Sequence, residues 1–277
     1  MRRSRLRLDT AARLLALLLL TALTVGPFLW LVSTSLKGPG ENLYAMPPQW
    51  LPQAPTLDNY ARVLQSQPFL QYLANSAAVA AMAVGSNLLL SSLAAYALAR
   101  IDFRGRALVF GAILATMMVP FQLLLIPLYE LALALGLHNS LLGLVLPHAC
   151  TAFGIFFMRQ AFLAVPRPLE EVALLEGVGR LRIWWHVMLP LVRPSLATLA
   201  VFGFVAVWGD FLWPLILIDE PSRFTLPLGV NRLAGTFSMD WRLVAAGAVF
   251  SLLPVLLVFG LSQRLFIEGA IKGAVKG

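Results

Sequence analysis

The sequence predicts an all-α protein that crosses a membrane six times, and three observations support this prediction. Of the 277 residues, 59% are hydrophobic and only 12% are charged, whereas an ordinary soluble domain has roughly 45 to 50% apolar and about 25% charged residues. The mean hydropathy is +0.80. Nearly uncharged stretches of about 20 residues recur along the chain, and one helix needs about 20 residues to cross the hydrocarbon core of a bilayer. These features exclude a soluble globular protein.

Six hydrophobic stretches are the candidate membrane spans, and they cover residues 14–35, 73–99, 107–128, 142–157, 195–218 and 243–261. The first stretch follows an Arg-rich start, but its length exceeds the roughly 7 to 15 residues of a signal-peptide core, so we expect a retained helix. Pro120 and Pro127 are expected to kink the third span. Pro147 and His148 interrupt the fourth span, and Arg159 closes it early.

The basic residues are distributed unevenly between the connections. Six spans place both termini on the same side of the membrane. With this division, 16 of the 21 Lys and Arg residues lie in the two terminal tails and in the second and fourth connections. Because cytoplasmic loops carry the excess of Lys and Arg, both termini are expected in the cytoplasm. The net charge of +8 is therefore attributed to membrane topology, and no nucleic-acid partner is expected.

These spans divide the chain into five parts. They are a cytoplasmic tail over 1–13, a first transmembrane helix over 14–35, an extracytoplasmic segment over 36–72, a core with five transmembrane helices over 73–265, and a cytoplasmic tail over 266–277. The extracytoplasmic segment is rich in proline, so mostly extended chain and turns are expected there. Residues 129–137 are too short to span a membrane and are expected at its interface. A single cysteine, Cys150, and three dispersed histidines predict no metal or redox site.

The connection after the fourth span, residues 166–192, predicts a helical hairpin outside the membrane. Pro168 suits the first turn of a helix, and Glu170 and Glu171 lie near the positive end of its dipole. Gly177 and Gly179 are predicted to stop this helix in the left-handed conformation.

A second short helix is predicted over residues 181–188, and Leu189-Pro190 is expected to break it. One face of the hairpin is too apolar to be left in water, and it is expected to contact either the membrane surface or another protein. The residues that make it apolar are Val172, Ala173, Leu174, Leu175 and Val178.

The residues of this hairpin carry a resemblance to a known family. The run Glu171-Val-Ala-Leu-Leu-Glu-Gly, followed by Leu189-Pro190, resembles the "EAA" loop of ABC importer permeases. The likeness to permeases of the carbohydrate-uptake family extends over roughly residues 10 to 277. It is carried by Leu57-Asp-Asn-Tyr, Asn75-Ser, Ala95-Tyr-Ala-Leu-Ala-Arg, Met118-Val-Pro-Phe-Gln, Leu125-Ile-Pro-Leu-Tyr, Leu135-Gly-Leu-His-Asn-Ser, Phe156-Phe-Met-Arg-Gln, Trp208-Gly-Asp-Phe-Leu-Trp-Pro, Thr225-Leu-Pro-Leu-Gly and the terminal Gly273-Ala-Val-Lys-Gly.

Three residues depart from the family pattern. Val172 replaces the usual second alanine of the motif, and Glu176 stands where aspartate is common. Gly209 stands where the family often has asparagine, so a contact made by that amide is not expected here.

The resemblance implies the fold of a type I ABC importer permease and its working partners. These are a second permease subunit, two copies of a separate ATPase, an extracytoplasmic sugar-binding protein, the sugar substrate and the lipid bilayer of a prokaryotic plasma (inner) membrane. No cofactor is implied in this chain, because ATP and Mg²⁺ would bind to the ATPase. In agreement, the sequence contains no P-loop pattern and no nucleophile elbow, so the chain is expected to be non-catalytic.

The implied mechanism is alternating access, in which ATP binding closes the ATPase dimer, carries the hairpin with it and rotates the spans. By resemblance, the ATPase-docking residues are Glu171, Ala173, Glu176, Gly177, Leu189 and Pro190, and the C-terminal tail contacts are Gly273, Lys276 and Gly277.

Asp210 is the only acidic residue inside a predicted span. A carboxylate there costs at least about 2.5 to 3.5 kcal/mol, and such groups usually face a cavity or a partner. Asp210 is therefore expected either to line the translocation path with Asn75, Gln122 and Trp208 or to form a structural hydrogen bond to a neighbouring helix.

Three other function classes compete with an importer subunit. An ion-coupled secondary transporter of a polar solute would explain Asp210, but it gives no reason for a Glu- and Gly-containing cytoplasmic hairpin. A membrane-embedded enzyme would need clustered catalytic groups, and Asp210 has no His or second acid nearby in sequence. A pure scaffold is the third alternative. The particular sugar is not readable from this sequence.

Overall fold

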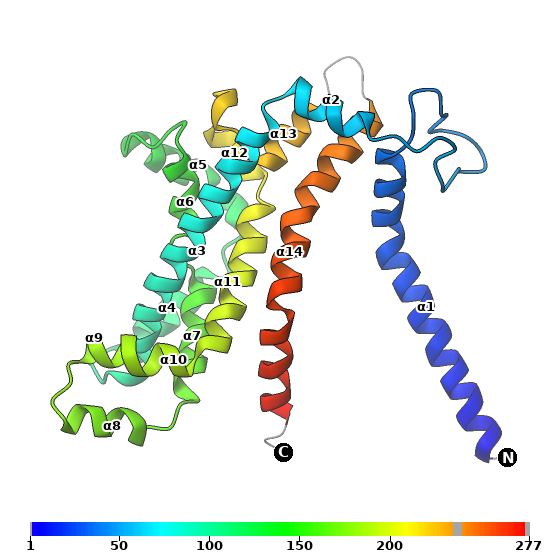
Figure 1. The fold of residues 1–277 in the computed structure, drawn as a ribbon. Coiled ribbons are helices and arrows are strands. Elements are labelled where there is room, and N and C mark those ends of the chain that lie inside the picture. The colour runs from blue at the N-terminus through cyan, green and yellow to red at the C-terminus, as the bar shows by residue number, and fades with distance from the viewer. Residues whose placement is uncertain (1, 235–239, 275–277) are drawn as a thin grey trace. The chain divides into compact units, whose positions relative to one another are not determined.

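The structure is a computed structural model that describes residues 2–234 and 240–274. Within these ranges the regular elements are helices and there is no strand (Figure 1), which confirms the all-α prediction. The chain groups into two compact units. Unit 1 comprises Met1–Phe69 and Gly229–Leu253, and unit 2 comprises Leu70–Leu228 and Pro254–Gly277.

Three helices among the described residues are long and apolar enough to cross a membrane alone. They are α1 (Arg2–Ser35), α3 (Phe69–Arg100) and α14 (Trp241–Ala274). The number of possible spans rises to six if each of three bent helix pairs counts as one span. Helix α14 continues through most of the predicted tail over 266–277, and α1 begins inside the predicted tail over 1–13.

The third predicted span is not one continuous helix. It consists of α4 (Arg106–Thr116) and α5 (Phe121–Ala134), which are bent by 100° relative to each other. Pro120 has φ −60° and ψ 135°, and a proline disfavours the helical conformation of the residue before it. The expected kink is therefore confirmed at Pro120, whereas Pro127 lies inside α5. Because α5 runs to Ala134, it also contains most of the stretch over 129–137 that we expected to be separate.

The fourth predicted span is also bent. It contains α6 (Leu141–Val145), the 3₁₀ turn η1 (Leu146–His148) and α7 (Ala152–Leu163), with an angle of 48° across the break. Thr151 begins α7 as its N-cap, because its Oγ1 accepts a hydrogen bond of 3.0 Å from the Gly154 N–H.

The fifth predicted span is interrupted toward its C-terminal end. It comprises α11 (Arg193–Trp208) and α12 (Leu212–Leu217), with the non-helical residues 209–211 between them. The turn η3 (Pro221–Arg223) and α13 (Leu226–Arg232) follow.

Between α7 and α11 the chain forms the predicted cytoplasmic hairpin. Its elements are α8 (Pro168–Leu175), α9 (Arg180–Ile183), the π-helical turn η2 (Trp184–Met188) and α10 (Leu189–Leu191). The second arm of the hairpin packs into the main core of unit 2 together with α3, α7 and α11. The buried residues of this core are Ala95, Tyr96, Ala99, Met158, Phe162, Ile183, Trp184, Met188, Val192 and Leu199.

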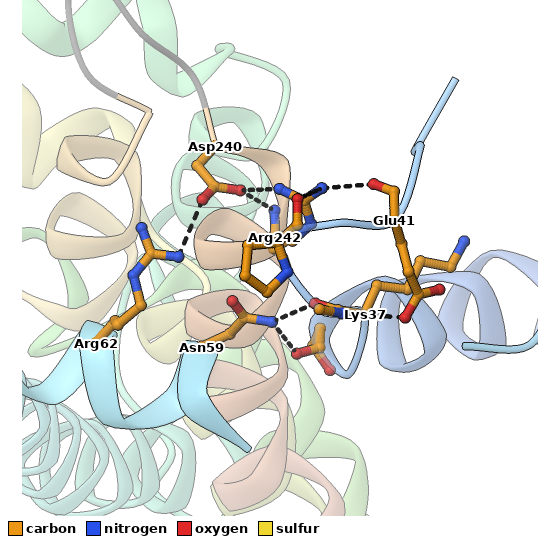
Figure 2. A network of polar contacts seen from close by, with 9 residues as sticks. Lys37, Glu41, Asn59, Arg62, Asp240 and Arg242 are labelled. Carbon is orange, nitrogen blue, oxygen red and sulfur yellow. Dashed lines mark hydrogen bonds and ion pairs between the residues drawn. The ribbon is translucent and has the colours of Figure 1, made fainter. Parts of the chain in front are cut away.

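The segment predicted to be extracytoplasmic is extended chain and turns over 36–57, followed by α2 (Asp58–Ser66). Figure 2 shows the polar network that fixes it. Asp240 accepts hydrogen bonds from Arg62 (3.2 Å) and from the backbone N–H of Arg242 (3.1 Å). The Arg242 guanidinium in turn donates to the Glu41 carbonyl at 2.6 Å. The segment is therefore held in a defined conformation although it has little regular structure.

Candidate coupling hairpin and polar sites in the helix bundle

The hairpin lies at the end of unit 2 where α3 ends, with α8 outermost and α9 between α8 and the rest of the unit (Figure 1). Its second arm, residues 180–191, makes an angle of 84° with α11. The hairpin therefore runs across the end of the spans instead of continuing one of them.

The turn between the two arms depends on Gly177. Its φ is +74°, and the backbone N–H groups of Gly177 and Val178 donate to the carbonyls of Leu174 and Ala173, both at 3.0 Å. This pair of bonds is a Schellman motif, which favours glycine at the left-handed position. Gly179 differs from our expectation, because its φ is −66° and its ψ is 148°. A single left-handed residue is enough to stop α8.

Pro190 does not break the second arm, contrary to the sequence prediction. The chain stays helical through the π-turn η2 and α10 and changes direction only at Val192, whose φ is −105° and ψ is 18°. Pro190 lies in the first turn of α10, where a missing N–H is tolerated, and the wider π-turn before it accommodates the change in hydrogen bonding.

Glu170 anchors the hairpin to the spans. Its side chain is only 7% exposed, and its Oε1 accepts a hydrogen bond of 2.6 Å from the Tyr96 hydroxyl on α3. Arg100 Nε lies 3.6 Å from Oε2 of the same carboxylate, and Arg180 lies 3.8 Å from Oε1. A buried charge is tolerated when it is paired and hydrogen-bonded in this way. The carboxylate thus joins α8 to α3 and α9.

Arg100 extends this anchor to a third helix. The Arg100 guanidinium donates hydrogen bonds to the carbonyls of Phe162, in the last turn of α7, and Val165, just beyond it. Because one guanidinium contacts α7 while it pairs with Glu170, the ends of α3 and α7 are joined to α8 at this point. The sequence predicts that Glu170 lies in the first turn of α8, but it does not reveal the contacts of its side chain. Its role as anchor depends on Tyr96 and Arg100, more than 60 residues away.

The opposite face of α8 is apolar and exposed. The exposed fraction is 61% for Val172 and 88% for Leu175, and Leu181 at the start of the second arm is 71% exposed. Glu171 and Glu176 are exposed beside them. The apolar face expected from the sequence is therefore real, but two of its five residues lie elsewhere, because Ala173 and Val178 pack against the buried core.

The other predicted docking residues occupy different environments. Gly177 is exposed at the turn, whereas Leu189 packs against the core and Pro190 is half-buried. Gly273 lies in the last turn of α14. Lys276 and Gly277 lie outside the described residues.

The predicted path residues make separate contacts within unit 2. Asn75 on α3 donates to the carbonyls of Ser222 (2.9 Å) and Phe224 (3.0 Å), and Ser76 accepts a bond of 2.7 Å from the Leu226 N–H. These bonds fix the chain before α13 to α3. Gln122 is exposed in the first turn of α5.

Asp210 is paired with a histidine that the sequence did not suggest. His148 Nε2 in η1 lies 3.2 Å from Asp210 Oδ2, and the Trp213 N–H donates to Oδ1 at 3.3 Å. The two side chains are 21% and 16% exposed. The hydrogen bond to a neighbouring helix that we considered for Asp210 is therefore present. His148 is 62 residues away, so no local pattern reveals the pair.

Trp208 borders a cavity within unit 2 that has a volume of about 690 Å³. Its ring stacks on Phe204 with a centroid distance of 5.2 Å. The cavity walls come from α3, α11 and the second half of α14 and are almost entirely apolar, with Ser262 as their only hydroxyl. Among residues 2–234 and 240–274, no group of three His, Cys, Asp or Glu side chains is arranged to hold a metal ion.

The chain is similar to membrane components of bacterial transport systems. Residues 87–270 match the family described as "Binding-protein-dependent transport system inner membrane component". The sulfoquinovosyl glycerol transport system permease protein SmoH of Agrobacterium fabrum is 35% identical over 253 residues, which is 91% of this chain and 88% of SmoH. The arabinooligosaccharides transport system permease protein AraQ of Halalkalibacterium halodurans is 35% identical over 227 residues, which is 82% of this chain and 81% of AraQ.

A solved structure agrees with these relatives. One chain of a bacterial ABC transporter involved in the import of the acidic polysaccharide alginate superposes with a TM-score of 0.84 and 25% identity, over 95% of this chain and 98% of that chain. The match to the family covers both the hairpin and the helices that hold it. The chain therefore belongs to the family of inner-membrane components of binding-protein-dependent transport systems, and its fold is that of an ABC importer permease.

Proposed function

We propose that this chain is one of two permease subunits of an ATP-driven importer for a sugar or oligosaccharide, located in the plasma (inner) membrane of a prokaryote. The observation that carries the proposal is the hairpin, which presents Val172 and Leu175 to solvent on one face while Glu170 ties the other face to α3. Helix α8 has an exposed apolar face and an opposite face that is bonded to α3. It is therefore suited to bind a partner protein and to transmit that partner's movement to the spans. The sugar class is supported by relatives named for the transport of sulfoquinovosyl glycerol and arabinooligosaccharides.

The proposed partners follow from what the chain lacks and what it exposes. The sequence has no P-loop, so ATP and Mg²⁺ would bind to a separate ATPase dimer, and this subunit would be non-catalytic. The exposed face of α8 is the proposed ATPase contact. A second permease would complete the pathway, and an extracytoplasmic binding protein would deliver the sugar. The excess of Lys and Arg on one side supports cytoplasmic termini.

In the proposed mechanism, closure of the ATPase dimer moves α8, and the Glu170–Arg100 clasp passes this movement to α3 and α7. The breaks at residues 117–120, 149–151 and 209–211 allow the helical segments to reorient as separate pieces. Packed helices of this kind switch between discrete arrangements, which is what alternating access requires.

The test is reconstitution of the assembled transporter in liposomes with its binding protein. We expect the cognate sugar to stimulate ATP hydrolysis by the reconstituted transporter. We also expect sugar uptake into the liposomes to require ATP. Sugar uptake driven by a proton or sodium gradient without ATP would contradict the proposal and favour the ion-coupled carrier. A panel of neutral and acidic oligosaccharides identifies the substrate in the same assay.

A further inference from the structure

Residues 42–57 form an external loop, the proline loop, whose composition is unusual for a segment outside the membrane. It contains no Asp, Glu, Lys, Arg or His, and it holds four prolines, at 47, 48, 52 and 55. Prolines lack a backbone N–H, so irregular chain rich in proline leaves fewer unpaired donors when it meets an apolar medium. The charged residues Glu41 and Asp58 stand immediately outside the two ends of the loop.

The largest side chains of the proline loop point outward instead of packing. The exposed fractions are 74% for Tyr44, 91% for Met46, 57% for Trp50 and 80% for Leu51. Single exposed apolar residues are normal on a protein surface, whereas several on one uncharged segment mark an interaction site.

The loop is held at the level of the outermost turns of α1. The Ser33 hydroxyl donates to the Trp50 carbonyl at 2.5 Å, and the ring centroids of Trp30 and Trp50 are 5.2 Å apart. The apolar part of α1 ends at Ser35, and the rise of a helix places residues 30 to 33 about 3 to 8 Å inside that end. Trp50 therefore lies at the depth where the span leaves the hydrocarbon core.

Polar contacts of Lys37 and Glu41 keep the loop from moving away from this level. Lys37 is 1% exposed, and its Nζ donates to the Gln49 carbonyl at 2.6 Å while it lies 4.3 Å from the centroid of the Trp30 ring. Glu41 accepts hydrogen bonds from the backbone N–H groups of Gly38 (3.1 Å), Gln53 (3.0 Å) and Ala54 (3.3 Å). Both charges are used to close the base of the loop.

A cavity of about 360 Å³ lies beneath Tyr44, within unit 1. It is lined by Trp30, Leu31, Leu43, Tyr44, Trp241 and Val244, among others. Thr34 also borders it, and the Thr34 hydroxyl is buried without a hydrogen-bond partner among the described residues. Aromatic and aliphatic walls with few polar groups, the Thr34 hydroxyl among them, match the chemistry of a lipid near its ester groups.

From these observations we propose that the proline loop lies in the external membrane–water interface and contacts lipid. Tyr and Trp side chains are enriched at this depth because they combine an apolar ring with a polar tip. The loop then fixes how deeply the outer end of α1 sits in the bilayer. The proposal depends on α1 crossing the membrane and not on the transported substrate, so it stands or falls separately from the proposed function.

The test measures the depth of nitroxide labels by electron paramagnetic resonance. The full transporter, with Cys150→Ser in this chain, is reconstituted in vesicles of phosphatidylethanolamine and phosphatidylglycerol without binding protein. Labels are attached through Met46→Cys and Leu51→Cys, with Gln65→Cys on the exposed surface of α2 as the matched control. Positions 46 and 51 are among the most exposed of the loop, so labelling is compatible with folding, and complex yield checks this.

We expect the labels at 46 and 51 to collide with oxygen but to be several-fold less accessible to a water-soluble nickel chelate than the label at 65. Equal nickel accessibility at all three positions would overturn the proposal. Protection that develops only after the binding protein is added would also overturn it, because the loop would then be a protein-docking surface.

Discussion

Two neighbouring acidic residues, Glu170 and Glu171, differ in burial and therefore in the roles that we propose for them. Glu170 is buried against Tyr96 and Arg100, whereas Glu171 is exposed one position further along α8. The sequence motif singles out Glu171. The fold shows that the carboxylate bonded to the spans is that of Glu170, because its partners Tyr96 and Arg100 belong to α3.

We expect Glu170→Gln to destabilise the permease by about 3 kcal/mol, because Arg100 is then left buried without its counter-charge. Glu171→Gln is the matched control and should leave permease stability unchanged while it reduces the amount of bound ATPase. Thermal unfolding of the purified subunit and ATPase retained per permease are the two measurements. Equal stability of both variants would show that the Glu170 clasp contributes nothing.

Asp210 offers a second prediction at the residue scale. In Asp210→Asn the remaining Oδ1 can still accept from the Trp213 N–H, and the Nδ2 amide can donate to an unprotonated His148 Nε2, so assembly and transport should be close to wild type. Asp210→Leu removes both groups and should cost about 1 to 3 kcal/mol, the penalty for unsatisfied buried groups. Complex yield and melting temperature report the loss. A stable Asp210→Asn complex with altered sugar preference would instead place this carboxylate on the translocation path.

At the scale of elements, the sequence predicts which segments are helical better than where the helices break. The apolar stretches predicted for the first, second and sixth spans are continuous helices, α1, α3 and α14. Pro27 lies inside α1 and Pro254 inside α14, and neither proline ends its helix. The break at residues 117–120 contains Pro120 and is explained by it. The break at 209–211 contains no proline. At the break over 209–211, Asp210 instead contacts His148, which is distant in sequence, so the local sequence pattern does not reveal this break.

The proline loop gives a prediction about pH. Partial burial of Glu41 acts to raise the pKa of its carboxyl, but the N–H groups of Gln53, Gly38 and Ala54 outweigh it, with a further contribution from Lys37. The pKa in the folded state therefore lies below its usual value of 4.5. A lowered folded-state pKa stabilises the loop fully above the unfolded-state pKa, and this stabilisation is lost as the pH falls through the folded-state value.

Glu41→Gln should accordingly increase amide exchange at Gly38, Gln53 and Ala54 at pH 7. The difference between variant and wild type should shrink progressively below pH 4.5, where the wild-type carboxyl also becomes protonated. Hydrogen exchange followed by mass spectrometry measures it. A difference that stays constant from pH 7 to acidic pH would mean that the Glu41 charge does not hold the loop.

For the whole molecule, membrane topology is predicted from charge alone, with 16 of 21 basic residues assigned to one side. In a Cys150→Ser background, a cysteine at Gln65 on α2 should react with a membrane-impermeant thiol reagent in intact cells, and a cysteine at Arg104 or Glu171 should not. Reaction of position 171 from outside would reverse the orientation and remove the proposed ATPase contact.

The most direct test of the account is the contact between the hairpin and the ATPase. Leu175 is 88% exposed at the end of α8, and Leu64 on α2, in the segment predicted to be extracytoplasmic, is 44% exposed. Replacing either with aspartate adds the same charge to a solvent-accessible site, so each variant should fold and insert. ATPase retained per permease in purified membranes is the measured quantity. We predict that Leu175→Asp lowers it about tenfold or more, equivalent to at least about 1.4 kcal/mol, while Leu64→Asp leaves it unchanged. Full retention of the ATPase by Leu175→Asp, with normal sugar-stimulated hydrolysis, would contradict the role of the hairpin as the coupling element.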